Sequence, residues 1–101
     1  MKFVIIGAGQ FGRALALYLT QSGYEVTIID TQESAVTELK DSVAYAVIGD
    51  ATDMRVLRQL DLEGDDTYVI VAVGEVFERS ILITAQLRQL GVKNLYVRSV
   101  N

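Results

Sequence analysis

Five short runs of apolar residues alternate with stretches of helical spacing, and this alternation constrains the fold more than any other feature of the chain. The runs are rich in Val, Ile, Tyr or Phe and are almost continuously apolar, which is typical of strands covered on both faces. They lie at residues 2–6, 25–29, 44–48, 67–73 and 94–98. Strands joined by helical crossovers pair in parallel through right-handed connections. The pattern therefore predicts a doubly wound α/β domain with a five-stranded sheet, strand order 3-2-1-4-5 and helices on both faces.

The segments between these runs predict four helices. The first is expected over residues 10–22, with Gly23 as its C-terminal stop, and the last over residues 75–90, ending at Gly91. The apolar residues expected on the inner face of the first helix are Phe11, Ala14, Leu15, Tyr18 and Leu19. Two shorter helices are expected to begin at Thr31 and Thr52, whose hydroxyls are suited to helix capping.

The segment "GAGQFG", residues 7–12, lies directly between the first predicted strand and the first predicted helix. Gly7 closes the strand, Gly9 falls where the backbone must approach a pyrophosphate, and Gly12 falls where helix and strand pack closely. The peptide N–H groups around Gly9, Gln10 and Phe11 would then point from the helix N-terminus toward bound phosphates. The motif predicts a Rossmann-type dinucleotide site, and a tight turn without a ligand stays open as the alternative.

An acidic residue completes this pattern at the end of the second predicted strand. Asp30 follows Gly12 by 18 positions, and a carboxylate there accepts hydrogen bonds from ribose hydroxyls and repels a 2′-phosphate. The following "TQES" contains no Arg or Lys that would attract such a phosphate. These residues favour NAD(H) or another adenosine nucleotide over NADP, while capping of the next helix is the other role open to Asp30.

Further polar and small residues follow the other predicted strands, as in "GDAT" and "VAVGE". Ligands of open parallel sheets bind outside the carboxyl ends of the strands, at the switch point between the first and the fourth. Val73 and Gly74 are therefore expected to line the cleft, and Asp50 and Thr52 to reach toward the adenine side. A plain loop carboxylate remains open for Asp50. Arg98, at the end of the fifth run, either faces a phosphate or forms an ion pair.

The composition removes most of the residues that common catalysis requires. The chain has no His and no Cys, so it lacks the commonest general base, a thiol nucleophile and the usual transition-metal ligands. No Tyr is followed four residues later by Lys, the pair that short-chain dehydrogenases use. Glu75 and Arg79 are expected to form a solvated ion pair, and the acids of "DLEGDD" lack calcium-loop spacing. We expect neither an enzyme nor a metal site.

Charge and hydropathy limit the partners and the location. The net charge is −4 without any block of Lys or Arg, which argues against a nucleic-acid partner. No apolar run approaches the roughly 18 residues of a membrane span, so direct membrane insertion is not expected. The absence of Cys permits a reducing compartment, and we expect a cytoplasmic location without a targeting segment.

The last predicted helix carries two apolar stripes. Val76, Ile83, Leu87 and Leu90 form one stripe that the sheet can bury. Phe77, Ile81 and Ala85 form a second stripe, which gives more apolar surface than one sheet face should cover. The second stripe indicates self-association, and a broad core-facing helix is the alternative.

The stretch "VIIGAGQFGRALALYLTQSGYEVTIID", together with "GDAT", "VIVAVGE" and "LGVKNLYVRSVN", resembles the N-terminal nucleotide-binding lobe of RCK (KTN) domains. These are the cytosolic regulators of Trk and Ktr potassium uptake systems, and the resemblance covers essentially the whole chain. It implies a lobe that binds NAD(H), ATP or ADP, dimerises and assembles into rings against a membrane pore protein. The nucleotide contacts it implies are Gly7, Ala8, Gly9, Gln10, Phe11, Gly12, Asp30, Asp50, Ala51, Thr52, Val73, Gly74 and Arg98.

Two departures from that family bear on the ligand and the assembly. Some Ktr-type relatives carry a basic residue where this chain has Gln10, and its loss favours NAD(H) over ATP or ADP. Family members continue into a crossover helix and a second lobe, whereas residues 1–101 are expected to form a single nucleotide-binding domain that stops before them.

The leading hypothesis is a non-enzymatic regulatory domain at the inner face of the cell membrane. It would bind NAD(H) or an adenine nucleotide (ATP, ADP or AMP) and gate a potassium-translocating membrane subunit as a homodimer or larger ring. The alternative is the cofactor-binding half of an NAD-dependent oxidoreductase. A third hypothesis is an α/β interaction module whose cleft stays empty.

Overall fold

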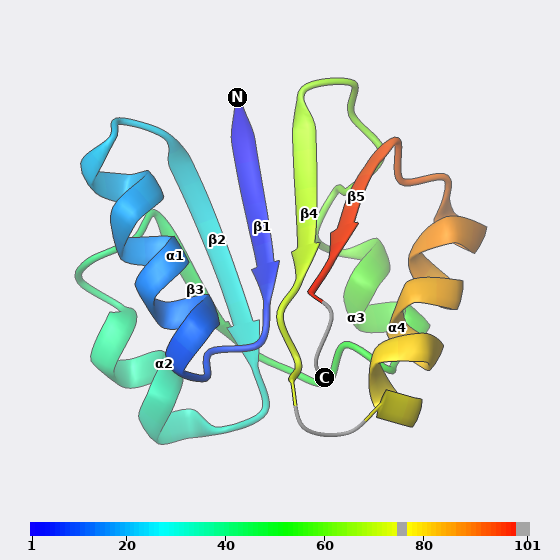
Figure 1. Cartoon of the computed structure of the whole chain (residues 1–101), viewed down its shortest axis with the longest axis horizontal. Coiled ribbons are helices and arrows are strands. Elements are labelled where there is room, and N and C mark those ends of the chain that lie inside the picture. Colours follow the sequence, from blue (N-terminus) through cyan, green and yellow to red (C-terminus); the bar gives the residue numbers. More distant parts are fainter. Residues whose placement is uncertain (75–76, 99–101) are drawn as a thin grey trace.

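Strands and helices alternate along the computed structural model, which describes residues 1–74 and 77–98 (Figure 1). The strands are β1 (Lys2–Ile6), β2 (Glu25–Asp30), β3 (Tyr45–Ile48), β4 (Thr67–Val71) and β5 (Asn94–Val97). The helices are α1 (Gln10–Gln21), α2 (Glu33–Leu39), α3 (Met54–Arg58) and α4 (Phe77–Leu90). No helix in the described part of the chain is both long and apolar enough to cross a membrane.

The sheet is parallel throughout and has the order β3-β2-β1-β4-β5, which confirms the predicted topology. The central strand β1 pairs with β2 on one side and with β4 on the other, and Ile6 lies opposite both Ile29 and Val71. Because these three strands end at the same level, the loops that follow them meet at one edge of the sheet. β4 ends two residues before the predicted boundary, at Val71, which leaves Val73 in the loop at that edge.

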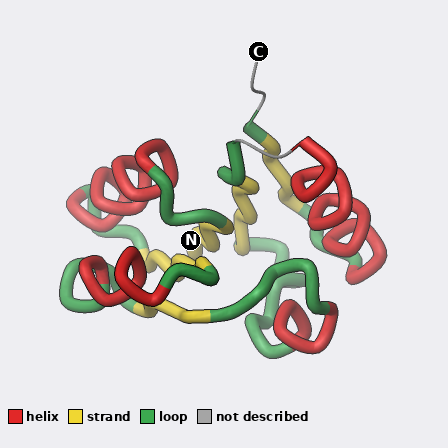
Figure 2. Tube along the Cα trace, turned by 90° about the horizontal axis from the view of Figure 1, so that it is seen from below, coloured by secondary structure: helices red, strands yellow, loops and turns green. Residues whose placement is uncertain are grey.

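Two hydrophobic clusters, one on each face of the sheet, hold the layers together. Ile5 packs in one cluster with residues of α1 and α2, such as Ala16 and Leu39. Its neighbour Ile6 packs in the other with residues of α3 and α4, such as Leu57 and Leu87. Figures 1 and 2 show the helices on both sides of the twisted sheet. Burial on both faces is the reason that the strand sequences are continuously apolar.

The inner face of α1 differs from the prediction. The residues that are buried or packed against the core cluster are Gly12, Leu15, Ala16, Leu17 and Leu19. The predicted inner residues that are exposed instead are Phe11 (39%), Ala14 and Tyr18 (66%). Gly12 has no side chain and allows the closest approach of α1 to the sheet, so the line from Gly12 through Ala16 faces inward. The prediction was therefore confirmed for Leu15 and Leu19 and wrong for Phe11, Ala14 and Tyr18.

Both predicted helix caps were also wrong. The N-cap of α2 is Gln32 rather than Thr31, and its side chain makes no capping hydrogen bond. The N-cap of α3 is Asp53 rather than Thr52, and its carboxylate accepts a hydrogen bond of 2.9 Å from the backbone N–H of Arg55. In each case the path of the preceding loop decides which of two adjacent polar residues reaches the helix end.

The long helix α4 has the two predicted apolar stripes, although its expected start at Glu75 and Val76 lies outside the described residues. Ile83 and Leu87 are fully buried against the sheet. Phe77 and Ile81 of the second stripe are 77% and 53% exposed. The second stripe is therefore surface in this chain, and the broad core-facing helix considered as an alternative is wrong.

Candidate functional site

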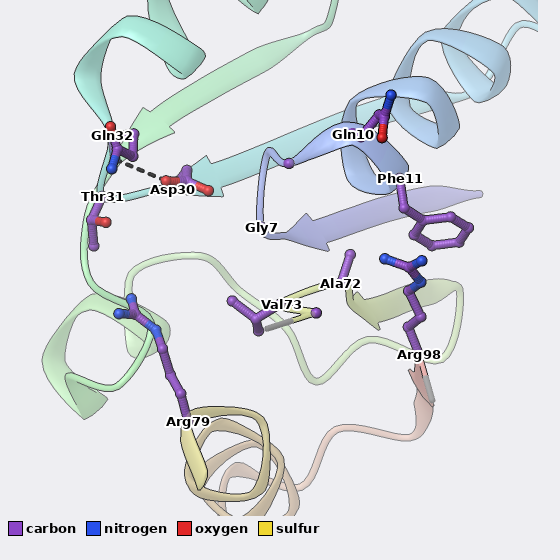
Figure 3. Close-up of a pocket in the computed structure, with 12 residues that line it drawn as sticks. Gly7, Gln10, Phe11, Asp30, Thr31, Gln32, Ala72, Val73, Arg79 and Arg98 are labelled. Atoms are coloured by element: carbon purple, nitrogen blue, oxygen red, sulfur yellow. Dashed lines mark hydrogen bonds between the residues drawn. The ribbon is translucent and has the colours of Figure 1, made fainter. Parts of the chain in front are cut away.

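A cavity of about 860 Å³ opens at the edge where β1, β2 and β4 end (Figure 3). This volume is in the range of small-molecule and cofactor sites. The residues that line it are Gly7, Gly9, Gln10, Phe11, Asp30, Thr31, Gln32, Ala72, Val73, Gly74, Arg79 and Arg98. They come from the loops after β1, β2 and β4, from the first turns of α1 and α4, and from Arg98, which directly follows β5. The cavity thus lies at the switch point of the sheet, where ligands of such folds bind.

The three glycines of the turn after β1 differ in what a side chain at each position would contact. Gly7 has a φ of +112°, which L side chains rarely adopt, and a Cβ there would lie 3.0 Å from the backbone of Ala72. A Cβ on Gly12 would lie 1.9 Å from the carbonyl oxygen of Gly7, so α1 packs directly on the turn. A Cβ on Gly9 would meet no atom within 4 Å. Gly7 and Gly12 are therefore required by the fold, whereas Gly9 keeps the cavity open.

The carboxylate of Asp30 fastens this glycine turn to the loop after β2. One oxygen accepts a hydrogen bond of 2.7 Å from the backbone N–H of Ala8, and the other accepts one of 2.8 Å from the N–H of Gln32. An ionised carboxylate has about four acceptor positions, so it retains capacity for hydroxyl donors in the cavity that it lines. Asp30 is thus both a structural link and an acceptor at the cavity wall.

Asp50 is held by its own turn after β3 and does not line the cavity. Its Oδ1 accepts hydrogen bonds from the backbone N–H of Thr52 at 2.9 Å and from the Thr52 hydroxyl at 2.7 Å. These bonds, aided by the charge of Arg79, lower the pKa of Asp50 below its ordinary value. Ala51 between them is buried in the core. Asp50 is connected to the cavity lining through its ion pair with Arg79.

Four lining residues were not predicted as site residues from the sequence: Thr31, Gln32, Ala72 and Arg79. Of these, Arg79 was expected to form a solvated pair with Glu75, which lies outside the described residues. The guanidinium of Arg79 extends from the first turn of α4 along the cavity wall (Figure 3). Its Nη2 lies 3.5 Å from Oδ1 of Asp50. Its Nε is buried without a hydrogen-bond partner in residues 1–74 and 77–98. The one available signal was the place of Arg79 in the helix that follows the cavity-lining loop after β4.

Arg98 lies near Phe11, away from Arg79 (Figure 3). The guanidinium carbon of Arg98 is 4.6 Å from the ring centroid of Phe11, which is a cation–π contact. Neither of the two roles weighed for Arg98 included this contact. The contact lies at the surface, where Phe11 is exposed, and it provides a positive charge beside the N-terminus of α1.

The lining combines groups that suit an anion with a group that suits hydroxyl donors. The backbone N–H groups at the start of α1 and the guanidinium of Arg98 suit phosphate oxygens, and the carboxylate of Asp30 suits hydroxyl donors. Val73 and its neighbour Ala72 form an apolar part of the cavity wall. Within the described ranges, no three acidic side chains gather in a way that would hold a metal ion.

Comparison with known proteins gives consistent matches. The family model described as "TrkA-N domain" matches residues 3–101. "Ktr system potassium uptake protein C" of Bacillus subtilis is 42% identical over 100 residues, which are 99% of this chain and 45% of that protein. The chain therefore spans about half the length of this relative.

Two solved structures have the same fold. The NAD(P)-binding domain of an exopolyphosphatase-related protein from Archaeoglobus fulgidus matches with a TM-score of 0.77 and 30% identity, over 94% of this chain and 68% of that one. The TrkA-N domain of inner membrane protein ybaL from Escherichia coli matches with a TM-score of 0.79 and 20% identity, over 99% of this chain and 73% of that one.

Proposed function

Because the chain belongs to the TrkA-N domain family, we propose that it is the nucleotide-binding domain of a potassium uptake system component. The observation that carries this proposal is the cavity at the switch point of the sheet, bounded by the glycine turn and Asp30. The potassium uptake protein of Bacillus subtilis described above supports the physiological setting. It favours a regulatory role over the cofactor half of an oxidoreductase.

The proposed ligand is NAD(H) or an adenine nucleotide, with its phosphates over the N-terminus of α1. Gly9 and Gln10 line the cavity there, and the helix dipole adds to the attraction for an anion. Asp30 is proposed to accept hydrogen bonds from a ribose. Gln10 brings no positive charge to the turn, which favours NAD(H) over the more highly charged ATP. The A. fulgidus domain, 30% identical and named as NAD(P)-binding, supports this choice of ligand class.

The proposed mechanism is regulation by occupancy rather than catalysis. A nucleotide shifts a conformational or assembly equilibrium only if it binds one state better than the other. We propose that the larger protein containing this domain forms a homodimer or ring at the cytoplasmic face of the membrane and acts there on a potassium-translocating subunit. The exposed stripe that includes Phe77 and Ile81 is the proposed contact between copies of this domain.

Calorimetric titration of the chain with NAD⁺, NADH, ATP, ADP and AMP tests the binding half of the proposal. We expect a dissociation constant well below about 1 mM for at least one of them, and a rise in melting temperature at ligand concentrations above it. No measurable binding of any of the five would refute a nucleotide-sensing role. Turnover of NAD⁺ or NADH with added small-molecule substrates would instead support an oxidoreductase.

A further inference from the structure

The two ends of the cavity present different side chains (Figure 3). At one end Arg98 lies under the ring of Phe11, close to the start of α1. At the other end Arg79 reaches from α4 toward the loop after β2, where Thr31 follows Asp30. If Asp30 receives the ribose, the base attached to that ribose lies at the Arg79 end.

The guanidinium of Arg79 is only loosely held in the described structure. Charge-assisted hydrogen bonds between guanidinium and carboxylate are about 2.7–2.9 Å long, whereas Nη2 of Arg79 is 3.5 Å from Asp50. The same oxygen of Asp50 already accepts two hydrogen bonds from Thr52. The buried Nε of Arg79 has no partner among the described residues. Arg79 thus lines the cavity, and the described residues use little of its hydrogen-bonding capacity.

We propose that Arg79 is a specificity-determining residue that stacks its guanidinium on the adenine of the bound nucleotide. This inference rests on the proposed function. The lining near Asp30 contains no aromatic ring, since Phe11 lies beside Arg98, so a planar base has the guanidinium of Arg79 as its platform. Guanidinium groups stack well on aromatic faces, and the flexible, strongly hydrated ammonium of Lys does not replace them there.

The charges at this end favour a base over a 2′-phosphate as the partner of Arg79. Asp30 lines the wall and Asp50 lies beside the guanidinium, so this end of the cavity has two carboxylates in addition to the positive charge of Arg79. A phosphate dianion would add to an existing excess of negative charge. A neutral adenine can lie against the guanidinium while Asp50 remains its ion-pair partner.

Titration of wild type, Arg79→Ala and Arg79→Lys with AMP and with ribose 5-phosphate tests the proposal. For Arg79→Ala we expect AMP binding to weaken about fivefold to tenfold, with ribose 5-phosphate unchanged. Arg79→Lys should fail to restore the affinity for AMP. The matched control is Arg88→Ala, which removes the same charge from an exposed position near the far end of α4. Melting temperatures without ligand check that each variant folds.

Several results would overturn the proposal, each in a different way. Full recovery in Arg79→Lys would mean that charge alone matters. An equal loss for AMP and ribose 5-phosphate would assign Arg79 to the 5′-phosphate. Preferential binding of NADP⁺ over NAD⁺ that disappears in Arg79→Ala would assign it to a 2′-phosphate. Unchanged AMP binding in Arg79→Ala would refute the role of Arg79 and leave the proposed function intact. Failure of the wild type to bind any nucleotide would refute both.

Discussion

Replacing Gly9 with aspartate should stabilise the unliganded fold slightly and abolish nucleotide binding. Gly9 is the N-cap of α1, with an extended backbone (φ −73°, ψ −168°) and no side-chain cap. A Cβ at this position meets no atom within 4 Å. Asp is among the preferred N-cap residues and its charge favours the positive end of the helix dipole. The same side chain would project into the proposed phosphate site.

The substitution should raise the stability of the unliganded fold by a small amount and lower the affinity for the nucleotide by a larger one. The new cap and the dipole contact should raise the free energy of unfolding by about 0.5 kcal/mol. For a domain of this size that corresponds to an increase in melting temperature of about 2–4 °C. One pair of like charges about 4 Å apart costs about 4 kcal/mol at an effective dielectric constant of 20. Partial screening still leaves an expected loss of affinity of at least about 100-fold.

Gly9→Asn and Gly12→Ala are the matched controls. Asn has nearly the same shape as Asp and caps equally well, so it isolates the effect of the charge. Gly12→Ala places a methyl group 1.9 Å from the carbonyl oxygen of Gly7 and must push α1 outward. Overpacking of this kind costs about 1–3 kcal/mol or more, so this variant should melt several degrees lower.

Thermal unfolding with and without ligand, together with calorimetry, measures both effects for each variant. The reasoning would be refuted if Gly9→Asp bound NAD⁺ or ADP as tightly as the wild type, because the phosphates then do not lie over the N-terminus of α1. A Gly9→Asp protein less stable than the wild type without ligand would refute the assignment of Gly9 to ligand space. Equal losses in the Asp and Asn variants would show that volume rather than charge excludes the ligand.

Three further predictions concern stability and assembly. Leu57 of α3 is fully buried, so Leu57→Ala should lower the free energy of unfolding by about 2–5 kcal/mol in urea titrations. The hydrogen bond and ion pair with Lys93 lower the pKa of Asp65. A lowered pKa stabilises the fold at pH values above the pKa of the unfolded chain, which is near 3.8, and this stabilisation is lost as the pH falls below that value. Wild type should therefore lose more stability than Asp65→Asn between pH 5 and about pH 2.5. Replacing exposed Phe77 and Ile81 with Glu should shift light-scattering masses toward the monomer without changing nucleotide affinity, and an unchanged mass distribution would count against the stripe as an interface.

The strand order could be predicted because it depends only on where the apolar runs lie along the chain and on the general rules for connecting parallel strands. Apolar runs of five to seven residues separated by segments of helical spacing predict the elements, and right-handed crossovers then leave few topologies. The helix-cap prediction for α3 was wrong because two adjacent residues are both suited to cap the same helix. Thr52 and Asp53 are both good caps, and the loop path selects Asp53 for α3 while the Thr52 hydroxyl bonds to Asp50. No periodicity in the sequence distinguishes the two.

The sequence predicted the glycine turn and also Asp30, Val73, Gly74 and Arg98, all of which line the cavity. Gly7 and Gly12 have steric requirements within the same turn, and spacing alone reveals them. Arg79 and Arg98 reach the cavity from elements far along the chain. Their neighbours in space, Asp50 and Phe11, depend on how α4 and β5 pack against the sheet. A charged residue in a first helical turn is usually solvated, so the place of Arg79 after the cavity-lining loop was too weak a signal to predict its position.

Asp30 illustrates how a correctly located motif residue can still have more than one role. Its carboxylate bonds the N–H of Ala8 in the glycine turn and the N–H of Gln32 at the start of α2. Removing it would leave both donors without that acceptor and would loosen the two loops that enclose the cavity. Loss of nucleotide binding in Asp30→Ala would therefore not separate a lost ribose contact from a displaced glycine turn. Gly9 does separate them, because its Cβ position is empty and the described fold makes no demand on it.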